Sequence, residues 1–289
     1  MNKRIILSSI VLTVLSIILI VSSCKKSTPI DSNTSAAQDH IVVETHIDDI
    51  VTLGLEASYG SLPTYMSTSC TQISFNNLNP LDKDTMYIDF DKPVCSGVAN
   101  LDGRYREGIL QYIYKGGLQY RDSSNVINVS WAFASEYIVD GNGINFNNFT
   151  IQNMGHVING NLTYSVSANV TLNKSGGGNI QCTSNKTKVL LAGEQPNNLP
   201  IDWAHAQIAI YGTASGTSSD GESFTATVTQ PNWLVRNFNC TSYRKCFVAG
   251  IEDFIPGSKP TRSINFGTGA CDNIAVISIN GYLFNETLP

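Results

Sequence analysis

Residues 162–172, LTYSVSANVTL, alternate apolar and polar side chains along their whole length. The apolar members are Leu162, Tyr164, Val166, Ala168, Val170 and Leu172. Successive side chains of a β-strand point to opposite faces of a sheet, so a period of two indicates a strand with one buried face. Residues 174–179, KSGGGN, follow directly, and glycine-rich polar clusters of this kind favour a turn. The stretch therefore predicts a strand that ends in a tight reversal of the chain.

Short apolar runs separated by turn residues continue on both sides of this strand. We expect further strands at residues 86–90, 108–114, 126–133, 137–139, 187–191, 206–211, 223–229, 246–251, 274–279 and 282–287. Residues 140–143, DGNG, and Asn280-Gly281 have the composition of hairpin turns. Strands at this spacing predict a mainly β fold, built as an antiparallel sandwich or as paired sheets. No linker-like stretch divides residues 59–289, which we expect to form one domain or two tightly packed pseudo-repeats.

One amphipathic helix is predicted before the strands, over residues 40–58. Its apolar positions recur at steps of three and four residues, at Val43, Ile47, Ile50, Val51 and Leu55. Asp39 precedes this pattern and is a suitable N-cap. The valines and Gly54 weaken the helical propensity, so a strand over residues 41–45 is the alternative. His46 falls on the polar side of the helix, where we expect its side chain to be solvated.

The first 24 residues have the organisation of a secretory signal peptide. Two basic residues precede a mostly apolar run, residues 5–21, and small residues precede Cys24. The ending Val21-Ser22-Ser23-Cys24 resembles the lipobox of bacterial lipoproteins. This resemblance implies that residues 1–23 are removed and that Cys24, now first in the chain, receives acyl chains such as palmitate. A transmembrane anchor is the alternative, because the apolar run is almost long enough to span a bilayer.

Lipidation of Cys24 would make the membrane a lasting partner, because several acyl chains bury enough CH₂ groups for permanent attachment. Residues 24–39 are small and polar, so we expect them to form a flexible tether. In some bacteria an Asp after the lipidated cysteine retains a lipoprotein in the inner membrane. This chain has Lys25 there, which favours the outer membrane and leaves its periplasmic and cell-surface faces as alternatives. A net charge of −5 gives no electrostatic reason to expect nucleic acid as a partner.

Seven cysteines are present, and lipidation of Cys24 leaves an even number for disulfides. The remaining six are Cys70, Cys95, Cys182, Cys240, Cys246 and Cys271. The runs Ile88-Asp89-Phe90 and Ile264-Asn265-Phe266 precede Cys95 and Cys271 at the same spacing, and both cysteines have another cysteine 25 residues upstream. This repetition predicts the bridges 70–95 and 246–271 in two equivalent units, with 182–240 as the remainder. An exchange of roles between Cys240 and Cys246 is one alternative, and buried reduced thiols are the other.

No motif in the chain carries a strong signal for catalysis, a cofactor or a metal. Residues 216–221 lack the order of a nucleophile elbow, and the glycine runs lack the lysine of a phosphate-binding loop. The cysteines form no CxxC pair and the histidines are isolated, which argues against zinc. Residues 140–151 begin like an EF-hand but fail its later positions, so Asp140 and Asn142 are left only as a looser calcium site. We predict no catalytic residue, no cofactor and no metal.

Two weaker patterns are compatible with carbohydrate hydrolysis or binding. Glycoside hydrolysis needs two carboxyl groups about 5–9.5 Å apart, for which the candidates are Glu136, Glu194 and Glu222. Sugar rings stack on aromatic side chains, for which the candidates are Tyr112, Trp131, Trp203 and Trp233. Solvated strand positions for the carboxylates and core packing for the aromatic rings are the interpretations we favour.

Taken together, the motifs resemble a family of Bacteroidota-type lipoproteins of unknown function, in which a lipobox, a polar tether and a helix precede a β-rich body. The resemblance rests on Ile88-Asp89-Phe90 with Cys95, on residues 102–108 and 137–143, and above all on residues 262–281, RSINFGTGACDNIAVISING. The last stretch is similar to the family's I-D-[FY]-G-x-G-x-C-D-N-x-A ending. The chain departs from the family at Asp91, where glycine is usual, and at Asn265, where aspartate is usual. No activity and no catalytic residue follow from this resemblance.

The sequence therefore predicts a lipoprotein of the outer membrane with a disulfide-stapled β body. Its expected role is structural, adhesive or ligand-binding at the cell envelope, without enzymatic activity. A carbohydrate-binding module of a glycan-uptake system, whose partner is a glycan, is the first alternative, and a glycoside hydrolase is the second. An envelope protein is the other kind of partner that we expect.

Overall fold

A computed structural model describes residues 31–58, 71–76, 85–91, 100, 102–115, 125–196, 199–240, 246–257 and 259–288. The chain separates into a first unit, Met1–Ser32, and a second unit, Asn33–Pro289, which holds every helix and strand described below. Cys24, Cys70 and Cys95 lie outside the described residues. The structure is mainly β, with 57% strand, one helix and a large antiparallel sheet among the residues described, which confirms the predicted fold class.

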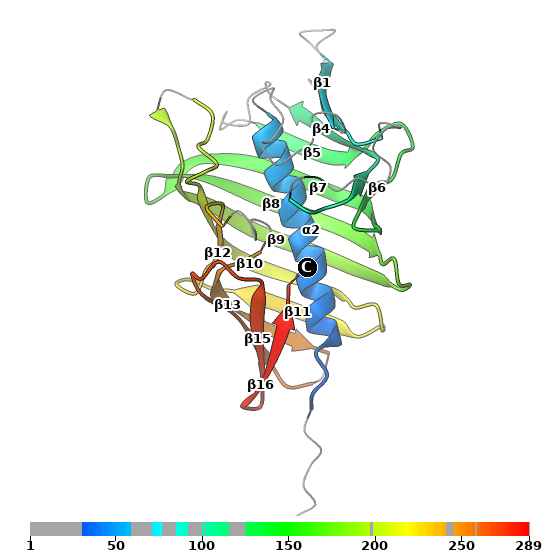
Figure 1. Cartoon of the computed structure of the whole chain (residues 1–289), viewed down its shortest axis with the longest axis vertical. Helices are drawn as coiled ribbons and strands as arrows, with labels where there is room; N and C mark the ends of the chain where they lie inside the picture. The colour runs from blue at the N-terminus through cyan, green and yellow to red at the C-terminus, as the bar shows by residue number, and fades with distance from the viewer. Residues whose placement is uncertain are drawn as a thin grey trace, which may run out of the picture. The chain divides into compact units, whose positions relative to one another are not determined.

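The strands that the structure describes, 16 in all, form one hydrogen-bonded sheet with antiparallel neighbours (Figure 1). They are β1 (Gln72–Asn76), β2 (Thr85–Asp89), β3 (Arg106–Glu107), β4 (Ile109–Lys115), β5 (Val126–Trp131), β6 (Tyr137–Val139), β7 (Asn142–Ile158), β8 (Asn161–Asn173), β9 (Asn179–Ala192), β10 (Gln207–Thr217), β11 (Ser223–Val228), β12 (Leu234–Asn237), β13 (Ala249–Pro256), β14 (Arg262–Thr268), β15 (Ile274–Ile279) and β16 (Tyr282–Thr287). The order along the sheet is β1-β2-β4-β5-β7-β8-β9-β10-β11-β13-β14-β15-β16. β12 pairs with β10 and β13, while β6 pairs with β3 and β7.

β8 confirms the strand predicted from residues 162–172. All six apolar side chains of its alternating pattern are buried, because they share the inner face of the sheet. The predicted hairpin turns are also present, since Val139 pairs with Asn142 and Ile279 pairs with Tyr282 across two-residue loops. Local turn chemistry and strict alternation were therefore sufficient to locate these elements.

The layer that faces this sheet is a helix instead of a second sheet. α2 (Ser35–Ala57) lies across the strands (Figure 1), and 20 of its 23 residues are buried. Strands far apart in the sheet contact the same helix: the Tyr112 hydroxyl of β4 donates a hydrogen bond to the Ile50 carbonyl at 2.7 Å, and Glu252 of β13 contacts His40. The sheet therefore curves around α2, and this helix takes the place that the predicted sandwich or paired sheets assigned to other strands.

α2 begins five residues before the predicted helix, so residues 35–39 belong to it and not to the tether. Thr34 occupies the N-cap position without a capping hydrogen bond from its side chain. Asp39, the predicted N-cap, lies inside the helix and contacts the turn residues Lys174 and Ser219, each at 2.7 Å. The alternative of a strand over residues 41–45 is excluded, because these residues are helical.

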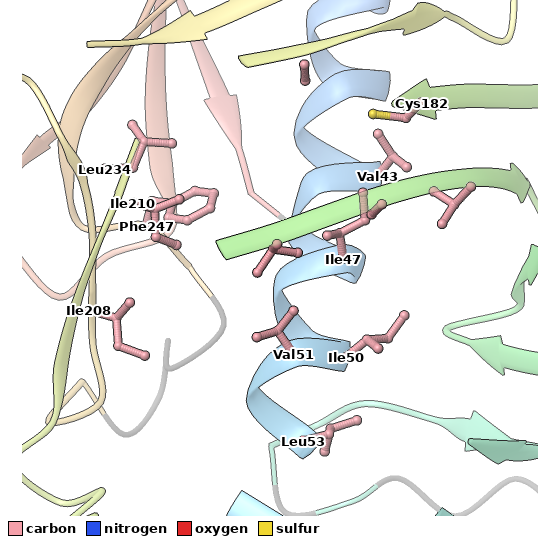
Figure 2. Packing of buried hydrophobic residues seen from close by; sticks show 14 of the residues in the cluster. Val43, Ile47, Ile50, Val51, Leu53, Cys182, Ile208, Ile210, Leu234 and Phe247 are labelled. Atoms are coloured by element: carbon pink, nitrogen blue, oxygen red, sulfur yellow. The ribbon is translucent and has the colours of Figure 1, made fainter. Parts of the chain in front are cut away.

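Apolar side chains of α2 and of the sheet share one core. Figure 2 shows part of it, with the labelled residues Val43, Ile47, Ile50, Val51, Leu53, Cys182, Ile208, Ile210, Leu234 and Phe247. Full burial of each large aliphatic side chain stabilises the fold by about 1.5–3 kcal/mol, which makes this core the main source of stability. Within the described part of the chain, no helix is both long enough and apolar enough to cross a bilayer.

Candidate functional site

A network of buried ion pairs joins α2 to the inner face of the sheet. The members of this interior ion-pair network are His40, Asp48, Asp49, Asp102, Arg104, Arg106, Lys186, Lys188, Arg236 and Glu252. Buried charges are rare unless they are paired, because transfer out of water is unfavourable. The network is therefore the first of two candidate functional sites.

Near the start of α2, Glu252 lies between two cationic or hydrogen-bonding groups. His40 Nε2 is 3.0 Å from one carboxylate oxygen of Glu252, and Lys186 Nζ is 3.1 Å from the other. Burial alone would raise the pKa of Glu252, but Lys186 and His40 lower it to about 2. The Glu252 carboxylate in turn raises the pKa of Lys186 against the effect of burial. Each charge thus stabilises the other.

Farther along α2, Asp49 forms the centre of a second cluster. Arg106 Nη2 donates to Asp49 at 3.0 Å and to Asp102 at 2.7 Å, while Arg104 Nη1 lies 3.3 Å from Asp49. Burial would raise the pKa of Asp49, yet the two guanidinium groups lower it to about 2. Next to it, Asp48 contacts Lys188 and Arg236. Asp48 and Asp49 of α2 therefore each face two cationic side chains from outside the helix.

Beside Lys186 and Glu252, the interior ion-pair network leaves space for little more than a water molecule. The cavity beside it has a volume of about 10 Å³ and is lined by Glu44, Ile47, Asp48, Val166, Lys186, Lys188, Ile210, Leu234, Phe247 and Glu252. This space corresponds to about one water molecule. Since the charges are paired with one another and the space is closed, the network holds α2 in place.

His46 differs from its prediction, because its ring is buried and not solvated. Its Nδ1 donates to the Val42 carbonyl at 2.7 Å, and its Nε2 is buried without a hydrogen-bond partner among the described residues. Burial first, and then the charge of Arg104, lower the pKa of His46 to about 4. The polar side of the helix is not its solvent side, because the curved sheet covers that side too.

The second candidate site is a groove on the outer face of the sheet. It has a volume of about 620 Å³ and is lined by Ser74, Phe75, Asn76, Tyr87, Asp89, Ile109 and Phe133. Tyr87 and Asp89 alternate along β2 with Met86 and Ile88, which are buried on the inner face. The side chains of Tyr87 and Asp89 therefore point away from α2. We call this feature the outer groove.

Phe133 is the most unusual residue of the outer groove. It is 77% exposed, and its φ of 55° lies in the left-handed region that bulky side chains avoid. Its ring stacks on that of Tyr87, with centroids 5.4 Å apart and planes at 29°. A strained backbone and an exposed aromatic ring at the same position are typical of a binding site.

Asp91 fixes the turn that carries Phe133. One carboxylate oxygen accepts a hydrogen bond from the Gly108 N–H at 2.6 Å, and the other accepts one from the Ser135 hydroxyl. Gly108 has a φ of 88°, and a Cβ there would lie 2.1 Å from the Glu136 carbonyl oxygen, so only glycine fits. Asp91 therefore holds two segments together beside the groove.

The outer groove combines a flat apolar surface with groups that form hydrogen bonds. The stacked rings supply the surface, and Ser74, Asn76 and Asp89 supply a hydroxyl, an amide and a carboxylate. Asp89 is the one carboxylate among the described lining residues, whereas glycoside hydrolysis uses two. The arrangement is suited to holding a ligand that has an apolar face and polar edges.

The disulfide pattern corrects two of the predicted bridges. Cys240 is bonded to Cys271, so the bridges 246–271 and 182–240 are wrong. The observed bridge agrees with the alternative in which Cys240, in place of Cys246, pairs with Cys271. Cys246 is buried in the apolar core, and Cys182 is a buried thiol 4.0 Å from Glu44, where burial and that carboxylate raise its pKa. The bridge 70–95 lies outside the described residues, and the two equivalent units lose their main support.

The other predicted candidates lie apart from one another. Tyr112 is buried, Trp203 packs on Phe238 with centroids 5.0 Å apart, and Trp233 packs on Tyr211 at 5.8 Å. Trp131 ends β5, two residues before Phe133.

The predicted acidic candidates each have a partner of their own. Glu136 is hydrogen-bonded to Asn173, Glu194 pairs with His156, and Glu222 pairs with Lys259. Asp140 accepts a hydrogen bond from the Tyr105 N–H, and Asn142 accepts one from the Ser175 N–H. In the described part of the chain, no three acidic, histidine or cysteine side chains gather as metal ligands.

Comparison of the chain with protein-family models, with curated proteins and with solved structures finds no match. The two candidate sites are therefore interpreted from their own geometry. The charges of the interior ion-pair network contact one another beside a cavity of about 10 Å³, whereas the outer groove is open and presents exposed aromatic surface.

Proposed function

We propose that the chain is an outer-membrane lipoprotein anchored through Cys24, and that its β body binds a saccharide in the outer groove. The ending Val21-Ser22-Ser23-Cys24 supports the anchor, through its resemblance to a lipobox. Phe133 supports the binding site, because an aromatic ring held exposed against its backbone preference has no use in a packed core. The two parts of the proposal stand on separate observations and have separate tests.

The chemistry of the outer groove favours a sugar ring over other small ligands. A pyranose ring has a face of C–H groups, which packs on the negative face of an aromatic ring, and an edge of hydroxyl groups. Tyr87 and Phe133 offer the aromatic faces, while Asp89 is a strong acceptor for hydroxyl donors. The volume of about 620 Å³ lies in the usual range of small-ligand sites. A net charge of −5 disfavours polyanionic ligands.

Calorimetric titration of the processed protein with gluco-, xylo- and manno-oligosaccharides tests the binding site. We expect one of these classes to bind, and we expect Phe133→Ala and Tyr87→Ala to abolish the heat of binding. Tyr105→Ala is the matched control, because Tyr105 is 49% exposed but does not line the groove. Absence of binding by all three sugar classes, or equal affinity in the Phe133 and Tyr105 variants, would overturn the binding proposal.

Mass spectrometry of the protein isolated from membranes tests the anchor. We expect a chain that begins at Cys24 and carries the added mass of acyl groups, and we expect Cys24→Ser to release the protein from the membrane fraction. A chain that retains residues 1–23, or an unmodified Cys24 in membrane-bound protein, would contradict the proposal.

A further inference from the structure

Several turns of the sheet lie at the edge where the chain enters α2. Phe254 pairs with Arg262, Arg262 with Ile279, and Ile279 with Tyr282, so the turns that follow β13 and β15 share this edge. The Arg262 guanidinium donates to the Asn33 carbonyl at 3.1 Å, which places the entry to α2 at the same level. Figure 1 shows the β15–β16 turn and the start of α2 at one end of the second unit. We call this end the entry edge.

The β15–β16 hairpin presents apolar side chains at the entry edge. Tyr282 is 50% exposed and Leu283 is 69% exposed, directly after the turn Asn280-Gly281. Tyr282 pairs with the buried Ile279 and Leu283 pairs with Ser278, so the two side chains lie on opposite faces of the hairpin tip. The hairpin tip therefore presents a large apolar side chain on each of its two faces.

The length of the tether limits how far the entry edge can lie from the membrane. Eight residues lie between Cys24 and Asn33, and the nine steps from one to the other span at most about 30 Å even when fully extended. A lipid on Cys24 therefore keeps the entry edge within that distance of the bilayer surface. The other edge of the sheet carries no such restriction.

We propose that the entry edge rests on the membrane and that Tyr282 and Leu283 enter the interfacial layer of the bilayer. This inference rests on the proposed lipidation of Cys24. Tyrosine is enriched at membrane–water interfaces, where its ring meets the acyl chains and its hydroxyl meets water, and leucine gains from removal of its side chain from water.

The charges at the entry edge are compatible with a lipid surface of no net charge. Lys259 pairs with Glu222 at 2.8 Å, and Lys174 pairs with Asp39 at 2.7 Å. Asp220 accepts hydrogen bonds from the hydroxyls of Ser218 and Ser35. Each of these lysines is paired with a carboxylate and Asp220 adds one negative charge, so the apolar tip and the tether direct the contact.

Tryptophan fluorescence of the processed, lipidated protein in phosphatidylcholine vesicles tests this contact. Leu283→Trp places an indole at the tip, and Tyr282→Trp is the second variant. Ile274→Trp is the matched control, because Ile274 is 48% exposed and pairs with Thr287 at the opposite end of the same hairpin. Vesicles that contain brominated acyl chains quench indoles at the bilayer surface. We expect a loss of emission in both tip variants beyond that of the parent protein, and none in the control.

Flotation of the same samples separates the failure of this inference from the failure of the lipid anchor. Protein that floats with the vesicles but shows equal quenching in the Leu283, Tyr282 and Ile274 variants retains its anchor and overturns the contact. The same conclusion follows if the tip is protected by a second copy, seen as a dimer in sedimentation. Protein that floats no better than Cys24→Ser overturns the anchor, and the contact with it.

Discussion

The inner and outer faces of the sheet reverse the usual distribution of residues. Inside, Asp49 and Glu252 are buried with cations although water is excluded. Outside, Phe133 exposes its ring to water and stacks on the half-buried ring of Tyr87. The inner charges satisfy one another in a closed space, whereas the outer rings have open surface to offer. Residue type alone therefore does not identify a binding site, because the partners of each group and its access to solvent decide whether it can bind a ligand.

The inner charges also define how α2 sits in the sheet. His40, Asp48 and Asp49 lie at different heights along the helix, and each contacts a different set of strands. A shift of the helix by one residue would rotate these groups by about 100° and leave buried charges unpaired. We interpret the interior ion-pair network as the device that fixes the register of the helix.

Removal of one buried charge from the interior ion-pair network should cause the largest loss of stability. Asp49→Ala leaves Arg104 and Arg106 buried beside an apolar group, so we expect a loss of about 3–5 kcal/mol in the free energy of unfolding. Glu222→Gln removes the partner of Lys259 at the surface and should change it by less than about 1 kcal/mol. Denaturant unfolding measures both, and equal losses would refute the assigned role.

A fall in pH should destabilise the protein through titratable groups on the inner face of the sheet. His46 has a pKa of about 4 in the fold and an ordinary value of 6.5, so the unfolded chain binds its proton first. Stability therefore falls as the pH drops from 6.5 to 4, by about 3 kcal/mol for this group. Asp49 and Glu252, with pKa values of about 2, extend the loss from about pH 4 down to 2.

The histidine part of this acid loss is separable by substitution. His46→Gln should flatten the stability profile between pH 6.5 and 4, whereas His205→Gln, which alters a histidine that is 72% exposed, should have a much smaller effect. Thermal unfolding across this pH range measures the difference. A profile that keeps its slope in the His46 variant would show that another group is responsible.

A change at Phe133 should have the smallest effect on stability and a decisive one on binding. Phe133→Gly relieves the left-handed backbone, and we expect the protein to become about 1 kcal/mol more stable. The same change removes the ring that stacks on Tyr87, so oligosaccharide binding should be lost. Unfolding and calorimetric titration of one sample measure both properties. A variant that gains stability and keeps its affinity would remove Phe133 from the site.

Sequence reasoning located the elements whose signals are local. β8 agrees within one residue at each end with the stretch 162–172, and β15 and β16 agree with residues 274–279 and 282–287. β9 was predicted only from residue 187, because its inward positions include Ser184, Lys186 and Lys188, which produce no apolar alternation. The partners of those lysines are on α2 and β13, and no local pattern records them.

The candidate binding site depends on a turn that breaks the strand pattern. Phe133 was assigned to the end of a strand over residues 126–133, whereas β5 ends at Trp131 and the chain turns. The turn is fixed by Asp91 and Gly108, which come from other segments. Tyr87 was placed in the correct strand, and its outward direction follows from the buried Met86 and Ile88. The stacking of Tyr87 on Phe133 is the one feature of this pair that the sequence did not predict.

The position of α2 in the chain has a consequence for how the molecule assembles. This helix is the earliest element described, yet His40 and its partner Glu252 are 212 residues apart. Contacts so distant in sequence slow the acquisition of the native state. A ribosome releases α2 long before the strands that enclose it. The native cover of the helix is therefore incomplete until the carboxyl-terminal strands are present, and an isolated amino-terminal half would leave the inner charges of α2 without their partners.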